Sequence, residues 1–352
     1  MLIAASSDET KRGLLASLEE EIAVVDSEEP TGLDEEKPGL EFDPAINSYS
    51  VANYIVEFEP DADKFAEVSH DPEVLAILCT KSTDCGRALK EDVAKDILVI
   101  ALTATASELA QGQNILRLAP SNALQAQALH DLLKKDIGSE GSFAVVYEPN
   151  LYGLDLYKNF MARYQLERLY ALSPPTLVGA FPIHTHLALQ DSQKGLNASQ
   201  VIEALASERL DGIVYMGYPE AFSDLTESSG NREMASHWYS GDGIEPFDLV
   251  EKGFDNLKIM ALYFVETEAS SEATYYYAYD AGKFMTAIVE GDFSQTVNRA
   301  DFLQKAKNTV LGVDIAKTGA KSFTSADTNA SFIVRFLEES EARTTVIKVT
   351  PF

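Results

Sequence analysis

The sequence predicts an α/β protein built around parallel sheets. Short apolar runs rich in β-branched and aromatic residues recur along the chain, and turn residues bound each of them. Between most of the first eight runs lie helical patterns of the length that a crossover needs, such as residues 9–22, 84–94, 123–133 and 156–164. Strands that alternate with helices form parallel sheets with helices on both faces.

Ten runs are expected to be strands: MLIAA, NYIVEFE, VLAILC, ILVIAL, FAVVYE, PTLVGAF, GIVYMGY, LKIMALYF, SFIVRFLEE and TTVIKV. One parallel sheet of ten strands would be unusual for 352 residues, so two sheets of about five, one in each of two lobes, fit better. The chain is expected to change sheets near Pro120. There a strand-like ILRLA segment ends, and Ser121 or Asn122 can cap a new helix.

Two segments do not fit the alternation. Residues 26–50 are acidic and contain three prolines, which predicts a solvent-exposed excursion or a partly ordered loop. Residues 223–238 are expected to begin as a helix, to break at Gly230 and to resume near Arg232.

The charge balance restricts the partners of this protein. With 28 basic and 56 acidic residues the formal charge is −28, which repels phosphate backbones, so nucleic acid is not expected as a partner. No run of about 18 apolar residues occurs, so no transmembrane helix is expected. The first residues, MLIAASSDETKRG, lack the basic start and long apolar stretch of a secretory signal, so either the protein is cytosolic or its signal has been removed from this sequence.

Motifs of catalysis are missing from the sequence. It contains no G-x-S-x-G elbow, H-E-x-x-H, P-loop or C-x-x-C, so binding is favoured over catalysis, and no catalytic residue or cofactor is expected. His184 and His186 would share one face of a strand, but two solvated loop histidines are the favoured interpretation, and no metal site is expected. Cys79 and Cys85 could form a small disulfide loop or remain two buried thiols.

Hydroxyl side chains follow two consecutive predicted strands. VLAILC is followed by TKSTD and ILVIAL by TATAS, and both loops lie at the carboxyl edge of one sheet, where open α/β sheets bind ligands. Hydroxyls and the N–H groups of the helix that begins near Asp84 suit a carboxylate. Helix capping by Ser82, Thr83 or Asp84 would explain one such loop, whereas two neighbouring loops favour a ligand site.

Several motifs, in this order, resemble the type I periplasmic binding proteins. They are AILCTKSTDCGRAL, ILVIALTATASELA, NILRLAPSNALQAQAL, FAVVYEPNLYGLDLYKNF and LDGIVYMGYPEAFSDL. The branched-chain amino-acid group, typified by the leucine/isoleucine/valine-binding protein, is the most similar. SGDGI, ATYYYAYDAGKFMTAIVEG and KTGAKSFTSADTNA extend the resemblance to roughly residues 70–350. The first 70 residues lack the opening motifs of the family.

The resemblance implies two Rossmann-like lobes with parallel sheets, joined by a three-crossover hinge that closes over a ligand in the cleft between them. The first lobe would contain residues 1–119 plus 268–315. The second would contain residues 120–267 plus 316–352.

The resemblance also implies ligand-binding residues in both lobes. In the first lobe, Thr80 would bind the ligand α-carboxylate and the second loop would grip the head group; the candidates are Thr80, Lys81, Ser82, Thr103, Ala104 and Thr105. In the second lobe, Tyr152 and Tyr218 would close over the ligand, and Asp242 would face its α-ammonium. The tyrosines could instead be packing residues, and Asp242 could instead favour a tight turn. Lys81 could pair with a second ligand carboxylate or extend into solvent.

The function implied by the resemblance is solute binding. The protein would be the extracytoplasmic component of an ABC importer, with its signal peptide outside this sequence. It would capture an amino acid or a related amphoteric or carboxylate ligand and deliver it to a membrane permease. The alternative is a ligand-sensing, regulatory or scaffold domain of the same fold, read by a signalling partner.

Overall fold

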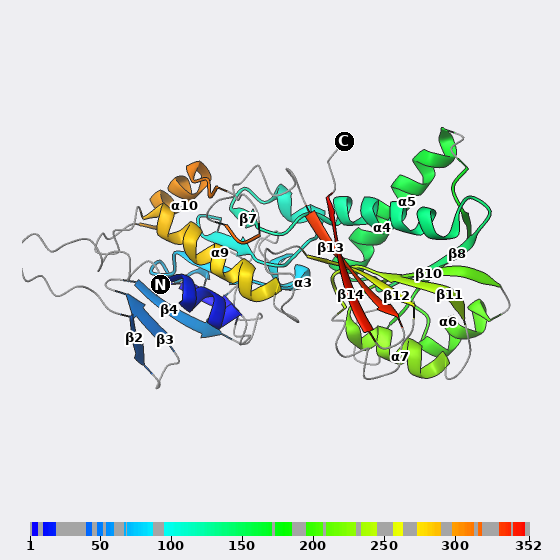
Figure 1. Cartoon of the computed structure of the whole chain (residues 1–352). Helices are drawn as coiled ribbons and strands as arrows, with labels where there is room; N and C mark the ends of the chain where they lie inside the picture. Colours follow the sequence, from blue (N-terminus) through cyan, green and yellow to red (C-terminus); the bar gives the residue numbers. More distant parts are fainter. Residues whose placement is uncertain are drawn as a thin grey trace, which may run out of the picture. The chain divides into compact units, whose positions relative to one another are not determined.

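The computed structural model contains two compact units (Figure 1). Unit 1 contains Met1–Ala119 and Glu272–Asp327, unit 2 contains Pro120–Tyr263 and Thr328–Phe352, and the residues from 264 to 271 are divided between them. The structure describes residues 2–5, 10–18, 40–43, 48–51, 54–59, 67, 69–86, 95–170, 173–184, 195–206, 209–229, 234–244, 256–262, 273–289, 298–312, 316–318, 331–338 and 341–348.

Unit 1 is built on a seven-stranded sheet with the order β2-β3-β4-β1-β5-β6-β7. The strands are β1 (Leu2–Ala5), β2 (Leu40–Asp43), β3 (Ser48–Val51), β4 (Tyr54–Glu59), β5 (Ala76–Cys79), β6 (Leu98–Ala101) and β7 (Ile115–Arg117). Strands β4, β1, β5, β6 and β7 pair in parallel, and β2 and β3 extend the sheet antiparallel beyond β4. The helical segments are residues 10–18, α3 (Ser82–Cys85), the 3-10 helix η3 (Ser107–Gln111), α9 (Ala273–Ile288) and α10 (Arg299–Asn308).

Unit 2 has a seven-stranded sheet with the order β14-β13-β12-β11-β10-β8-β9. The strands are β8 (Ser142–Tyr147), β9 (Thr176–Pro182), β10 (Leu210–Met216), β11 (Ala235–Ser240), β12 (Leu257–Leu262), β13 (Ser331–Glu338) and β14 (Glu341–Lys348). Strands β9, β8, β10, β11 and β12 pair in parallel, and β13 and β14 continue antiparallel from β12. Its helices are α4 (Asn122–Ile137), α5 (Leu151–Leu169), α6 (Ala198–Leu205) and α7 (Pro219–Ser229).

The two sheets share one strand order. Numbered along the chain, the five parallel strands of each sheet lie in the spatial order 2-1-3-4-5, which is the doubly wound arrangement. In such a sheet the connections leave in opposite directions from the first and third strands, which opens a crevice at their carboxyl ends. That switch point lies between β1 and β5 in unit 1 and between β8 and β10 in unit 2.

Helices cover both faces of the unit 2 sheet. In Figure 1, α4 and α5 lie on one face, and α6 and α7 lie on the other. The α6/α7 face buries alternate residues of β8, β10 and β12, for example Ala144 and Val146 of β8, together with Phe222 of α7. Trp238 of β11 packs edge-on against Phe222, with ring centroids 5.8 Å apart. The predicted α/β class with parallel sheets is therefore confirmed.

The number of strands was underestimated. All ten predicted runs contain strands, and the strand-like ILRLA segment forms β7. Each sheet has seven strands because β2, β3 and β11 also join them. Residues 40–43 and 48–51 form antiparallel strands at the sheet edge. Of the two alternatives for residues 26–50, the partly ordered loop is therefore wrong there, and the remainder of that segment lies outside the described residues. Residues 235–240 form β11 rather than a resumed helix, because pairing between β10 and β12 stabilises the extended chain.

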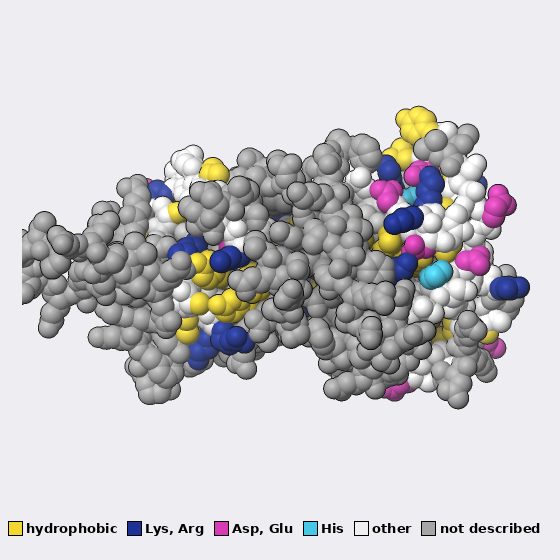
Figure 2. Space-filling model, in the orientation of Figure 1, with side chains coloured by type: hydrophobic (Ala, Val, Ile, Leu, Met, Phe, Trp, Pro, Cys, Tyr) yellow, Lys and Arg dark blue, Asp and Glu magenta, His cyan; other side chains and the backbone are white. Residues whose placement is uncertain are grey.

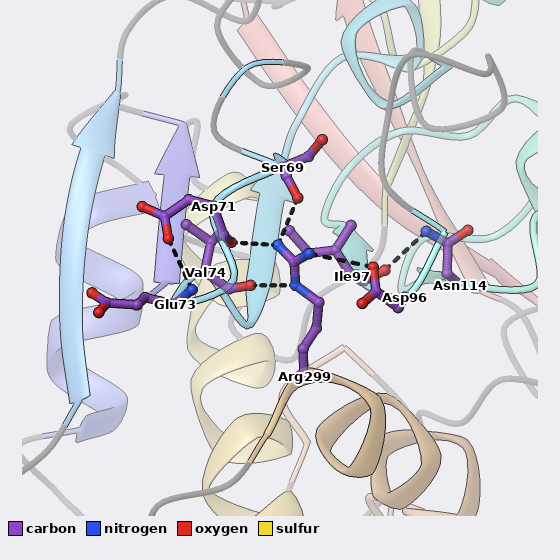
Figure 3. A network of polar contacts seen from close by, with 8 residues as sticks. All are labelled: Ser69, Asp71, Glu73, Val74, Asp96, Ile97, Asn114 and Arg299. Atoms are coloured by element: carbon purple, nitrogen blue, oxygen red, sulfur yellow. Dashed lines mark hydrogen bonds and ion pairs between the residues drawn. The ribbon is translucent and has the colours of Figure 1, made fainter.

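Arg299 joins α10 to the amino ends of β5 and β6 (Figure 3). Its Nε donates to the carbonyl of Val74 at 2.9 Å, and its Nη2 donates to the carbonyls of Ser69 and Asp71, both at 2.6 Å. Nη1 lies 3.3 Å from Oδ1 of Asp96, the residue before the turn into β6. The guanidinium therefore satisfies three backbone carbonyls at the sheet edge opposite the hydroxyl loops.

Lys317 and Thr318, which begin the KTG motif, form hydrogen bonds within unit 1. Asp280 of α9 is buried, and its carboxylate accepts hydrogen bonds from the backbone N–H groups of Lys317 at 2.7 Å and Thr318 at 2.9 Å. The Thr318 hydroxyl also donates to this carboxylate. Residues 316–318, assigned to the second lobe by the sequence prediction, therefore belong to unit 1, because a buried carboxylate needs these donors.

Candidate functional site

The two hydroxyl loops of unit 1, residues 80–84 and 103–107, contact each other at the carboxyl ends of β5 and β6. Ser82 is buried, and its Oγ accepts hydrogen bonds from the backbone N–H groups of Thr105 at 3.2 Å and Ala106 at 3.1 Å. The Thr103 hydroxyl donates to the carbonyl of Thr80 at 3.2 Å. Parallel pairing of β5 with β6 places the loops side by side, as the sequence predicted.

Helix capping does not explain these hydroxyls. Lys81 occupies the N-cap position of α3 and makes no side-chain cap hydrogen bond, and the N–H groups of Asp84 and Cys85 both donate to its carbonyl. The alternative interpretation, in which Ser82, Thr83 or Asp84 caps the helix, is therefore wrong, because the helix begins at Ser82. The predicted helix over residues 84–94 includes only the end of α3, and residues 87–94 lie outside the described residues.

Thr105 has a buried hydroxyl at the carboxyl end of β6. Its side chain is 1% exposed, and Oγ1 has no hydrogen-bond partner among the residues that the structure describes. Ala104 beside it is also buried, whereas Thr80 is half-buried and Lys81 is exposed. A buried hydroxyl without a partner is costly, so a ligand oxygen at this position would be favourable.

A disulfide links Cys79, the last residue of β5, to Cys85 in α3. It spans six positions in sequence and encloses the whole first hydroxyl loop. A closed loop of this length restricts the unfolded chain and stabilises the fold by about 2 kcal/mol. The first loop is therefore braced on both sides, by the disulfide and by the contacts of Ser82.

In unit 2, Tyr152 lies on the first turn of α5, at the carboxyl ends of β8 and β10. Asn150 caps this helix through a 2.8 Å hydrogen bond from the N–H of Gly153. Gly153 is required there because a Cβ would lie 2.5 Å from the carbonyl oxygens of Glu148 and Met216. The helix start therefore rests directly on the strand ends and places Tyr152 at the switch point.

Asp242 is held by two neutral donors. The Tyr152 hydroxyl donates to Oδ1 of Asp242 at 2.9 Å, and Nε2 of Gln125 donates to the same oxygen at 2.7 Å. The N–H of Gly243 donates in turn to the Tyr152 hydroxyl, also at 2.9 Å. Burial, with the Asp242 charge, raises the pKa of Tyr152, so the hydroxyl stays protonated and remains a donor. Asp242 is thus held in a hydrogen-bond network with Tyr152 and Gln125.

Tyr218 completes this surface. Its ring stacks on the Tyr152 ring with centroids 5.2 Å apart and an angle of 25° between the planes. The backbone N–H of Tyr218 donates to Oε2 of Glu148 at 2.5 Å, and its carbonyl accepts from the Tyr215 hydroxyl at 2.7 Å. The structure therefore brings the three predicted unit 2 residues together, with Tyr152 in contact with both Asp242 and Tyr218. We call Tyr152, Tyr218 and Asp242 the tyrosine surface.

Sequence reasoning missed two residues that hold this surface, Gln125 and Glu148. Glu148 directly follows β8, and the rule that directs attention to strand ends could have identified it. Gln125 lies within the amphipathic α4 and is fully buried. Its contact with Asp242 joins residues 117 positions apart, and no local pattern indicates such a contact.

One group of described residues has the spacing of metal ligands: His130, Asp131 and Glu167, on α4 and α5. Both carboxylates already have cationic partners. Lys134 lies 2.9 Å from Glu167, and Arg163 lies 3.6 Å from Asp131 and 3.9 Å from Glu167. Acidic and basic side chains intermingle over these helices in Figure 2. The group is an ion-pair network, and His184 lies apart from it on the segment after β9, while His186 is outside the described residues.

Comparison with known proteins gives matches at the level of structure. No protein-family model and no curated protein matches the sequence. An ABC transporter substrate-binding protein from Desulfitobacterium hafniense, in complex with Leu, matches with a TM-score of 0.66 and 11% identity, over 98% of this chain and 99% of that chain. The leucine-binding protein LivK from Thermotoga maritima gives 0.64 and 17%, over 99% and 98%. A solute-binding protein from R. palustris, in complex with benzoate, gives 0.62 and 12%, over 99% and 96%.

The chain has the type I periplasmic binding protein fold. These matches cover nearly the whole chain, including the first 70 residues, where the sequence motifs of the family are missing. In this fold the strand-end loops of both units are the ligand-facing candidates, as the switch-point rule also indicates. Among the described helices, none combines the length and the apolar character needed to cross a bilayer.

Proposed function

We propose that the protein is the extracytoplasmic solute-binding component of an ABC importer, and that its function is binding rather than catalysis. The observation that carries this proposal is the tyrosine surface, which lies at the switch point of unit 2. Solved proteins of the same fold and nearly the same length are substrate-binding proteins of ABC transporters.

The proposed ligand is an amino acid or a related small amphoteric or carboxylate compound. Asp242 offers a carboxylate that Tyr152 and Gln125 orient, and a carboxylate in this setting suits a ligand ammonium group. Thr105 in unit 1 has a hydroxyl without a hydrogen-bond partner among the described residues, which suits a ligand carboxylate oxygen. We propose that Asp242 and Thr105 are both ligand-binding groups, and that Thr80, Lys81, Ser82, Thr103 and Ala104 form the carboxylate-binding loops of unit 1.

Two of the similar solved proteins support a ligand with a carboxylate. One was solved in complex with leucine and the other with benzoate. Both compounds carry a carboxylate, but only leucine carries an ammonium group. Asp242 favours the amino-acid class, because a carboxylate facing an aromatic acid would repel it.

A thermal-shift screen tests this proposal. The panel contains leucine and isoleucine, isopentylamine and 4-methylpentanoate as analogues of leucine that lack one charged group, and benzoate and 4-hydroxybenzoate. A ligand at about 100 times its Kd stabilises the folded state by about 2.7 kcal/mol, which raises the melting temperature by several degrees. We expect stabilisation by an amino acid and none by either leucine analogue. Stabilisation by benzoate alone would exclude the amino-acid class, and an unchanged melting temperature across the panel would contradict the ligand class.

A further inference from the structure

Both backbone polar groups of Tyr218 are bound by side chains. Glu148, which follows β8, accepts its N–H at 2.5 Å, and Tyr215 of β10 donates to its carbonyl at 2.7 Å. These contacts come from the two strands that flank the switch point of unit 2. The Tyr218 backbone is therefore fixed from both sides of the crevice, independently of its ring.

The preceding residue, Gly217, lets the loop lie directly on the Glu148 carboxylate. A Cβ at this position would be 2.7 Å from Oε2 of Glu148 and 2.4 Å from the Tyr215 hydroxyl oxygen. Glu148 itself is buried, with 8% of its surface exposed. The carboxylate is thus enclosed beneath the loop that carries Tyr218.

The surroundings of Glu148 are acidic. The pKa of Glu148 is raised to about 7: burial raises it most and the neighbouring Glu220 of α7 also raises it, whereas the hydrogen bonds from the Tyr218 N–H and the Asn150 side chain lower it. Burial, with the charges of Glu148, Glu220 and Asp224 of α7, raises the pKa of Tyr215. Glu148 therefore changes charge near neutral pH while its neighbours hold it in place.

We propose that Glu148 is a positioning residue for the ligand site: its carboxylate fixes the Tyr218 backbone, keeps the Tyr218 ring stacked on Tyr152, and so sets ligand affinity. This inference deepens the proposed function. Its statement about ligand affinity rests on that function, whereas its statement about the Tyr218 backbone does not. A hydrogen bond to an ionised acceptor is about twice as strong as one to a neutral acceptor, so the ionised form holds the loop more tightly. Affinity should therefore decrease as the pH falls through about 7.

The first experiment needs no ligand. Protein labelled with ¹⁵N-tyrosine is titrated from pH 5.5 to 8.0, and the Tyr218 amide signal is assigned through Tyr218→Phe. We expect the Tyr218 amide shift to titrate with a midpoint near pH 7 and to become flat in Glu148→Gln, which keeps an acceptor oxygen and the side-chain size. Glu148→Asp, which keeps the charge, should restore a titration. A Tyr218 amide that does not titrate, or that titrates equally in Glu148→Gln, overturns the proposal.

Glu220→Gln is the matched control, because it removes a neighbouring exposed acid rather than the one beneath the loop. In Glu220→Gln the Tyr218 amide shift should still titrate, but with a midpoint at lower pH, since Glu220 raises the Glu148 pKa. Loss of the transition in Glu220→Gln would show that the Tyr218 amide reports the titration of Glu220 and not that of Glu148.

The second experiment measures leucine affinity by calorimetry at pH 5.5 and 8.0. We expect about fivefold weaker binding at pH 5.5 in the unsubstituted protein and equal binding at both values in Glu148→Gln. An equal pH dependence in both proteins overturns the link to affinity. Failure of leucine to bind at either pH contradicts the proposed ligand instead, and the amide titration then still decides whether Glu148 positions Tyr218.

Discussion

The hydroxyl loops of unit 1 and the tyrosine surface of unit 2 occupy the same place in two sheets of one strand order, but different interactions hold them. In unit 1, backbone N–H groups, a serine hydroxyl and a disulfide join two adjacent loops. In unit 2, a long-range side-chain network orients a carboxylate and two aromatic rings.

The difference shows that one strand order can present different chemistry at the carboxyl ends of its strands. Unit 1 presents small neutral hydroxyls, and that of Thr105 has no hydrogen-bond partner among the described residues. Unit 2 presents the Asp242 carboxylate. Neutral hydroxyls suit a ligand carboxylate and a carboxylate suits a ligand ammonium group, so the two units differ in the group that each can bind.

Arg299→Ala should have the largest effect, on the stability of unit 1. Removing the guanidinium leaves the carbonyls of Ser69, Asp71 and Val74 without their donor, which should lower the free energy of unfolding by about 3–5 kcal/mol. Hydrogen exchange should accelerate more in β5 and β6 than in β8 and β10. Lys307→Ala, at an exposed position of the same helix, is the control and should change little. Equal acceleration in both units would show that Arg299 does not act on unit 1 alone.

Asp242→Asn should have the largest effect on binding. The substitution keeps an oxygen for the Tyr152 and Gln125 donors but removes the charge, so amino-acid affinity should fall about 100-fold with little loss of stability. Calorimetry on the best ligand of the screen measures this.

Asp211→Asn is the matched control for that measurement. Asp211 accepts hydrogen bonds from Ser142 near the start of β10, at the opposite edge of the sheet. The Asp211→Asn substitution should leave amino-acid affinity unchanged. Unaltered affinity in Asp242→Asn would remove Asp242 from the site.

Ser82→Ala tests how the unit 1 loops are held. It leaves the buried N–H groups of Thr105 and Ala106 without an acceptor and should cost about 2–3 kcal/mol of stability, measured by urea denaturation. Thr83→Ala, one residue further and exposed, should cost less than about 0.5 kcal/mol. If the two substitutions cost the same, Ser82 is not the brace between the loops.

Thr105→Val should have the smallest effect of these substitutions, and its effect should be confined to ligand affinity. Since the hydroxyl has no partner among the described residues, an isosteric apolar side chain should leave the stability of the free protein unchanged or slightly raised. Affinity for the amino acid, measured by calorimetry, should fall about tenfold, because the ligand carboxylate loses the Thr105 hydroxyl. Loss of stability without loss of affinity would make Thr105 structural.

Local sequence determined most of the fold. Apolar runs such as AILC in β5 and LVIA in β6 are buried on both faces, and such strands can be recognised without knowledge of their neighbours. Ser121 as a helix cap was also predictable, and its Oγ accepts the N–H of Leu124. Strands β2, β3 and β11 were missed because their polar composition becomes extended only through pairing with neighbouring strands.

The sequence by itself determined where the strands end, and so which loops hold Thr80, Thr105, Tyr152 and Tyr218. Only the tertiary structure decided what those residues contact. The donation from Gln125 to Asp242 joins segments 117 positions apart, and the contact between Glu148 and Tyr218 joins segments 70 apart. Sequence periodicity describes neighbours along one element, whereas a buried carboxylate is stabilised by whichever donors the packed sheet brings to it.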